Sequence, residues 1–153
     1  VQLTRHQLTE PQSELVPLLM HCTNDAERIA DHTEIILQLT ERLTKTDKKI
    51  SEAGRKDLKK MWEVLNDQQK NVIAALGSDN PETLKFALKD QRKISKMADK
   101  FESNHIDRLR KGNCLMANGI IFIEMLGELE KIGAHLENIA ERTPEIQKHY
   151  IEL

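Results

Sequence analysis

The apolar residues of this chain recur every three or four positions over four long segments, which short polar or glycine- and proline-containing stretches separate. Such spacing is typical of helices that bury one face. The pattern predicts helices over about 11–43, 51–76, 80–111 and 115–142, and no segment alternates convincingly as a strand would. Short links between long amphipathic helices favour antiparallel neighbours. The predicted fold class is all-α, an antiparallel bundle of four long helices.

Residues that favour helix ends support these boundaries. Thr9 precedes the first segment, where its hydroxyl can accept a hydrogen bond from a free amide of the first turn, and the second segment begins after Ser51 with Glu52 in its first turn. Gly112 ends the third segment, because glycine readily adopts the left-handed conformation that follows many helices. Proline cannot donate a backbone hydrogen bond, so Thr143 and Pro144 predict that the fourth helix stops and a short tail helix begins.

The composition fits a single helical domain over residues 1–153. Hydrophobic residues make up 39% and aromatic residues only 3%, so aliphatic side chains must fill the core. The net charge of −2 gives no overall field that would attract nucleic acid, and two cysteines cannot build a disulfide framework. No apolar run approaches the roughly 20 residues that cross a bilayer. The chain begins at Val1 without a methionine, so we expect an excised fragment.

An internal repeat links the first segment to the fourth. A shift of 103 residues aligns five identical pairs: Glu27, Ile29, His32, Glu34 and Ile36 with Glu130, Ile132, His135, Glu137 and Ile139. Ile29, His32 and Ile36 share one helical face, which favours packing. Both histidines are expected to be hydrogen-bonded residues of the bundle rather than ligands.

Glu27 and Asp31 lie one turn apart, where two carboxylates repel each other. Arg28 can offset the repulsion by pairing with Asp31, and the spacing alone favours this interpretation. A bound cation is the sharper alternative, because paired carboxylates are hard oxygen ligands. Both interpretations stay open at this point.

Three stretches carry a resemblance to a known family. The segment Glu27-Arg28-Ile29-Ala30-Asp31-His32 resembles the signature helix of the PhoU family of phosphate-uptake regulators, and the fourth segment resembles its second copy. The run from His105 to Leu109, followed by Gly112-Asn113-Cys114, is similar to the PhoU-like domain at the C-terminus of bacterial sodium/phosphate cotransporter proteins. The resemblance covers about residues 12–141.

The resemblance implies a fold of two three-helix bundles, of which this chain holds the last helix of the first bundle and all of the second. It implies a non-catalytic, cytoplasmic regulatory domain tied to phosphate transport and attached to the inner membrane through a missing N-terminal transmembrane region. The expected partner is a membrane transporter domain of the same or another chain, with a homodimer also possible. We expect Leu19, Ile29 and Ile36 to cover the other helices or a second chain.

The resemblance also bears on metals, because family members bind iron or zinc through Glu/Asp-x-x-x-Asp motifs. Glu27 and Asp31 match the motif in the first copy, and Glu130 matches in the second, where Ala134 replaces the expected acid. The partner positions on the third helix are Gln91 and Ser95, neither of which is anionic. The predicted metal ligands are therefore Glu27, Asp31 and Glu130, at a weak site rather than a tight cluster. The alternative function is a stand-alone, metal-binding PhoU-like regulator of phosphate signalling.

Other candidate chemistry is ordinary. No Ser/His/Asp or Cys/His grouping has supporting context, so no enzyme activity is expected. Glu102 and His105 have the spacing of a di-iron helix motif, but the second such pair is missing and a surface pair near a helix end is expected.

Overall fold

A computed structural model describes residues 8–45, 49–77, 81–112 and 116–151, and these form four long helices. The helices are α1 (Glu10–Lys45), α2 (Glu52–Gly77), α3 (Pro81–Arg110) and α4 (Met116–Ile151). No strand occurs in the described residues. The predicted all-α bundle of four long helices is confirmed.

Local hydrogen bonds explain where the helices begin and end. Before α1, the Thr9 amide donates to Gln12 Oε1 at 3.1 Å, the backbone half of a capping box. Before α2, the Gly54 amide donates to Ser51 Oγ at 3.2 Å. After α3, Gly112 adopts a positive φ of 69°, a conformation that a side chain would strain. The predicted helix ends at these three places are confirmed.

The fourth helix differs from the prediction near its end. No break occurs at Pro144, and α4 continues through it to Ile151 in place of a separate tail helix. Thr143 is buried and its hydroxyl donates to the Ile139 carbonyl at 3.1 Å, while Ile146 packs in the protein interior. Burial of this last segment offsets the backbone hydrogen bond that proline cannot make.

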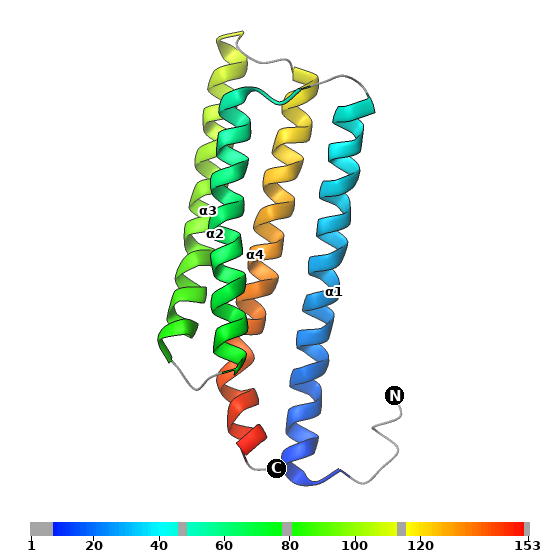
Figure 1. Cartoon of the computed structure of the whole chain (residues 1–153), viewed down its shortest axis with the longest axis vertical. Helices are drawn as coiled ribbons and strands as arrows, with labels where there is room; N and C mark the ends of the chain where they lie inside the picture. Colours follow the sequence, from blue (N-terminus) through cyan, green and yellow to red (C-terminus); the bar gives the residue numbers. More distant parts are fainter. Residues whose placement is uncertain (1–7, 46–48, 78–80, 113–115, 152–153) are drawn as a thin grey trace.

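The helices divide into a three-helix bundle and one attached helix. Helices α2, α3 and α4 each pack against the other two, whereas α1 packs against α4 alone among the described helices. Figure 1 shows α1 running beside α4, on the side away from α3. This division agrees with the predicted arrangement of three helices plus one.

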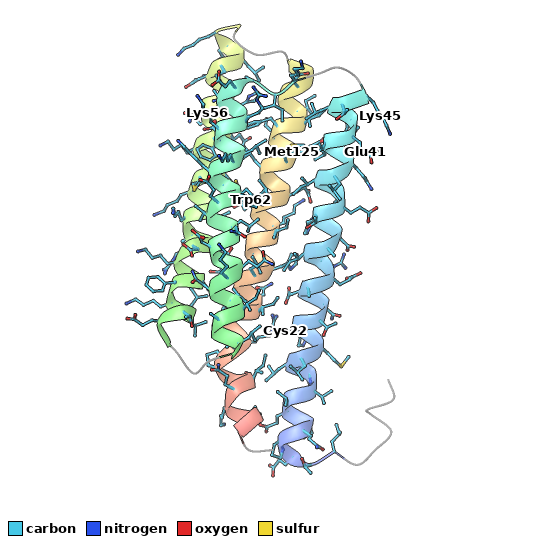
Figure 2. All side chains as sticks on the ribbon, viewed as in Figure 1. Cys22, Glu41, Lys45, Lys56, Trp62 and Met125 are labelled. Carbon is cyan, nitrogen blue, oxygen red and sulfur yellow. The ribbon has the colours of Figure 1, made fainter. Side chains whose placement is uncertain are left out.

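The main core lies among α2, α3 and α4 and receives residues of α1 along one side. Its most buried large side chains include Met61, Ile94 and Phe122. A second small cluster joins Leu39 of α1 to Met125 of α4, which Figure 2 shows on the side of α4 that faces α1. None of the described helices carries a stretch that is apolar and long enough to cross a membrane.

Candidate functional site

Two histidine–carboxylate pairs cross between α1 and α4. His32 Nδ1 on α1 lies 2.6 Å from Glu128 Oε2 on α4, and His135 Nδ1 on α4 lies 2.7 Å from Asp25 Oδ1 on α1. The two rings stack on each other with centroids 5.4 Å apart and planes at 23°. We name these four residues the His–carboxylate seam. Each helix therefore supplies one acid and one histidine to the same contact.

The Asp25 end of the seam is the more heavily hydrogen-bonded end. Asn138 Nδ2 donates to Asp25 Oδ1 at 3.1 Å, and Arg142 Nη1 donates to Asp25 Oδ2 at 2.7 Å. Burial alone would raise the pKa of Asp25, but hydrogen bonds from His135, Asn138 and Arg142, together with the charge of Arg142, lower it below the ordinary 3.8. Asp25 is thus held as a carboxylate although it is only 8% exposed.

The Glu128 end repeats this pattern with a different cation. Lys131 Nζ donates to Glu128 Oε1 at 2.7 Å, on the oxygen that His32 does not use. Burial would raise the pKa of Glu128, but the hydrogen bonds and charges of Lys131 and His32 lower it below 4.5. An ionised carboxylate only accepts hydrogen bonds, so each histidine carries a proton on Nδ1. The seam therefore joins α1 and α4 through charge-assisted hydrogen bonds.

The predicted metal ligands lie outside the seam. Glu27 and Asp31 are on the exposed side of α1, and Arg28 Nη1 lies 3.7 Å from Asp31 Oδ2, which confirms the ion pair that the spacing favoured. Glu130 is half-buried on α4. No three His, Cys, Asp or Glu side chains of the described residues come together as a group that could hold a metal ion. Metal binding at Glu27, Asp31 and Glu130 stays a prediction.

Neutral amides occupy the core beside the second copy of the motif. Gln68 is fully buried and its Nε2 donates to the Gly133 carbonyl at 3.0 Å, while Gln91 Nε2 donates to Ser95 Oγ at 3.4 Å. A methyl group at Gly133 would collide with Gln91 Oε1, so glycine makes room for this amide. The positions predicted to lack anionic ligands therefore pack as a neutral polar contact.

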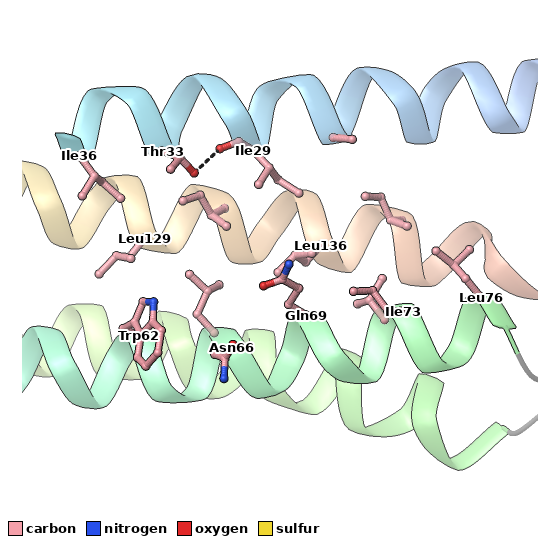
Figure 3. Close-up of a pocket in the computed structure, with 15 residues that line it drawn as sticks. Ile29, Thr33, Ile36, Trp62, Asn66, Gln69, Ile73, Leu76, Leu129 and Leu136 are labelled. Carbon is pink, nitrogen blue, oxygen red and sulfur yellow. Dashed lines mark hydrogen bonds between the residues drawn. The ribbon is translucent and has the colours of Figure 1, made fainter. Parts of the chain in front are cut away.

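An apolar groove of about 560 Å³ runs between α1 and α2, with α4 as its floor. Figure 3 shows Ile29 and Ile36 of α1 facing Trp62 and Ile73 of α2 across it. Trp62 is 55% exposed and Ile73 is 61% exposed, whereas Ile29 and Ile36 are half-buried against the core. Of the face predicted on α1, Leu19 alone stays largely exposed, beside a smaller cavity. We name the larger cavity, between α1 and α2, the α1–α2 groove.

His105 is buried, contrary to the expected surface pair with Glu102. Its side chain packs against the ring of Phe122, with centroids 4.9 Å apart, and only 2% of the residue is exposed. Gly119 leaves the space that the imidazole fills, because a methyl group there would collide with His105 Nε2. Burial, assisted by the charge of Arg108, lowers the pKa of His105 below 6.5. His105 is a packing residue of the bundle.

Asp25 and Glu128 are the site residues that the sequence pattern did not single out. The signal was present, because the shift of 103 residues that aligns His32 with His135 also aligns Asp25 with Glu128. Each acid precedes its aligned histidine by seven residues, or two helical turns, and so lies on the same face. In an antiparallel pair of helices, each acid then meets the histidine of the other copy. The expectation that both histidines are hydrogen-bonded bundle residues is confirmed.

Comparison with known proteins adds a family to this geometry. The family model described as the PhoU domain matches residues 58–143, more than half of the chain, from within α2 to within α4. No curated protein and no solved structure matches the chain.

Proposed function

The chain belongs to the PhoU domain family, and from this we propose that it is the non-catalytic, PhoU-like regulatory part of a sodium-dependent phosphate cotransporter. The match over residues 58–143 carries the proposal, because this family regulates phosphate homeostasis. The motif from His105 to Cys114, which resembles the cotransporter-type domain, supports the finer assignment. The expected partner is a membrane transporter domain at the cytoplasmic side of the inner membrane.

The packing of α1 supports a role in interaction. Among the described helices, this helix contacts only α4. One side of α1, which includes Ile29 and Ile36, lines the α1–α2 groove. A helix held by one neighbour can move without dismantling the core of the other three. We propose that a segment of the transporter packs in the groove and that the position of α1 reports its presence to the bundle.

The genetic test removes the coding region for residues 1–153 in frame and measures uptake of labelled phosphate in cells grown with scarce and abundant phosphate. Loss of the difference in uptake between the two conditions would support the proposal. Uptake that responds normally without these residues would contradict it. Reading the gene upstream of Val1 distinguishes the fused form, which requires several hydrophobic spans there, from a separate regulator.

A matched pair of variants tests the groove. Ile73→Lys places a charge on the exposed rim of the groove, whereas Ile120→Lys places it on an equally accessible site of α4 that does not line the groove. We expect only Ile73→Lys to alter the phosphate response, with both proteins folded by circular dichroism. Equal effects of the two variants would remove the groove from the mechanism.

The second candidate function is that of a stand-alone, metal-binding regulator. The exposed carboxylates of Glu27 and Asp31 on one turn of α1 favour it, since a cation could bind them without disturbing the core. Elemental analysis of protein purified without chelator decides between the two. Stoichiometric iron or zinc that disappears in Asp31→Ala would establish the alternative.

A further inference from the structure

The outer face of α3 carries a continuous row of cations. It consists of six exposed side chains, five of them lysines, that we name the basic stripe: Lys85, Lys89, Arg92, Lys93, Lys96 and Lys100. At 100° per residue they fall within about 100° of the helix circumference, opposite the buried positions such as Ala87 and Ile94. The row spans about 22 Å along the axis. In Figure 2, nitrogen-tipped side chains project from the outer side of α3, away from the other helices.

The stripe is not neutralised by its own helix. Within the described residues, none of its six side chains forms an ion pair. Asp90 is turned toward α2, where it accepts a hydrogen bond from Asn71 at 3.0 Å. The remaining acids of this part of α3, Glu82 and Asp99, lie near the two ends of the stripe.

Arg92 of the stripe interacts electrostatically with a carboxylate of another helix, that of Glu137 on α4. The charge of Arg92 acts to lower the pKa of Glu137 on α4, although burial and the neighbouring Glu141 raise that pKa overall. The charges of the stripe repeat along α3 at spacings of three and four residues. Like charges at such spacing destabilise an isolated helix. An anionic partner would relieve this repulsion.

The chemistry of the stripe favours a diffuse anionic surface over a shaped protein pocket. Lysine is depleted at the cores of protein interfaces, and its compact, mobile charge does not read geometry as arginine does. Neither the α1–α2 groove nor the smaller cavity beside Leu19 includes a residue of α3. At the edge of the stripe, Phe86 is 48% exposed, a placement typical of aromatic side chains that enter the interface of a bilayer.

We propose that the basic stripe binds the anionic headgroups of a phospholipid bilayer and lays α3 along the membrane surface, with Phe86 entering the headgroup region. The attraction to an anionic leaflet increases with each lysine near the surface and falls as salt screens the charges. This inference goes beyond phosphate regulation and does not depend on it. A bundle bound in this way presents the α1–α2 groove away from the lipid-facing side of α3.

The test measures sedimentation of the 153-residue chain with large vesicles of phosphatidylcholine, with and without about 30% phosphatidylglycerol. The stripe variant carries Gln at Lys85, Lys89, Lys93 and Lys96. Its control carries Gln at four exposed lysines elsewhere, Lys45, Lys56, Lys59 and Lys60, and has the same net charge. We expect the stripe variant to lose roughly a hundredfold or more in partitioning onto the anionic vesicles and the control to lose less than about fivefold.

Several results would overturn the proposal. Equal losses in the two variants would show a dependence on net charge alone, and equal binding to vesicles without phosphatidylglycerol would exclude headgroup charge. Tighter binding of duplex DNA, or of polyglutamate, than of anionic vesicles at the same salt would assign the stripe to nucleic acid or to an acidic protein. Circular dichroism checks that each variant is folded, and Lys85→Gln with Lys89→Gln alone must give an intermediate loss. Phe86→Ala must weaken binding without changing its dependence on salt.

Discussion

Replacing Asp25 by alanine removes the acceptor of three hydrogen bonds at one end of the His–carboxylate seam. The donors are His135, Asn138 and Arg142, at 2.7, 3.1 and 2.7 Å. Hydrogen bonds to charged groups contribute about 1.5–3 kcal/mol each when buried. The side chains of His135 and Arg142 remain 23% and 29% exposed, so water partly replaces the lost acceptor. We expect the free energy of unfolding to fall by about 2–4 kcal/mol.

The assay is urea unfolding at pH 7 followed by circular dichroism, with the midpoint and slope fitted for each protein. Asp31→Ala on the same helix is the matched control, because Asp31 is exposed and its ion pair with Arg28 is 3.7 Å long. Such surface pairs contribute less than about 1 kcal/mol. A loss below about 1 kcal/mol for Asp25→Ala, or one no larger than the control, would refute the view that the seam fastens α1 to α4.

The pH dependence gives the same prediction an independent check. The pKa of Asp25 is lower in the folded state than the 3.8 of an ordinary aspartate. As the pH falls, Asp25 of the unfolded chain therefore takes up its proton before Asp25 of the folded protein does. The stability that the ionised Asp25 provides is fully present above the unfolded pKa, and it is lost as the pH falls through the lower pKa of the folded state. The stability gap between the wild type and Asp25→Ala should narrow from about pH 5 to about pH 2. A gap that stays constant or widens over this range would contradict the assignment.

Three further outcomes are expected. Gly133→Ala should not give the roughly 0.5–1 kcal/mol of stabilisation in urea unfolding that alanine normally brings to a helix interior, because its methyl group would collide with Gln91 Oε1, and the same substitution should be more favourable in a Gln91→Ala background. Burial lowers the pKa of His105, so the free energy of unfolding should fall as the pH drops below the ordinary 6.5. His105→Gln should flatten this dependence of stability on pH. If the variant keeps the same dependence, a group other than His105 causes it. Protein purified without chelator should carry less than one iron or zinc per chain, and any metal retained should be lost in Asp31→Ala; elemental analysis decides both points.

Features set by neighbouring residues were predictable from the sequence. The helix starts after Thr9 and Ser51 and the end at Gly112 depend on hydrogen bonds and backbone conformation within one turn. The Arg28–Asp31 ion pair is likewise a contact between residues three positions apart. Short-range preferences of this kind do not require knowledge of how the helices pack.

Features set by packing were harder to predict. The carboxylate partners of His32 and His135 lie 96 and 110 residues away, so they depend on the register of α1 against α4. The burial of His105 depends on the space at Gly119 of another helix, which a surface-pair interpretation does not consider. Similarly, α4 continues through Pro144 because its last turns are covered by other parts of the protein.

The crossed arrangement of the seam gives it an approximate two-fold axis between the stacked rings of His32 and His135. Rotation by half a turn about this axis exchanges the two acid–histidine pairs, as in an isologous contact between two subunits. Sliding α1 along α4 by one turn, about 5.4 Å, would separate His32 from Glu128 and Asp25 from His135 at the same time. The seam therefore sets the register of α1 against α4, and we expect any movement of α1 relative to the bundle to keep this register.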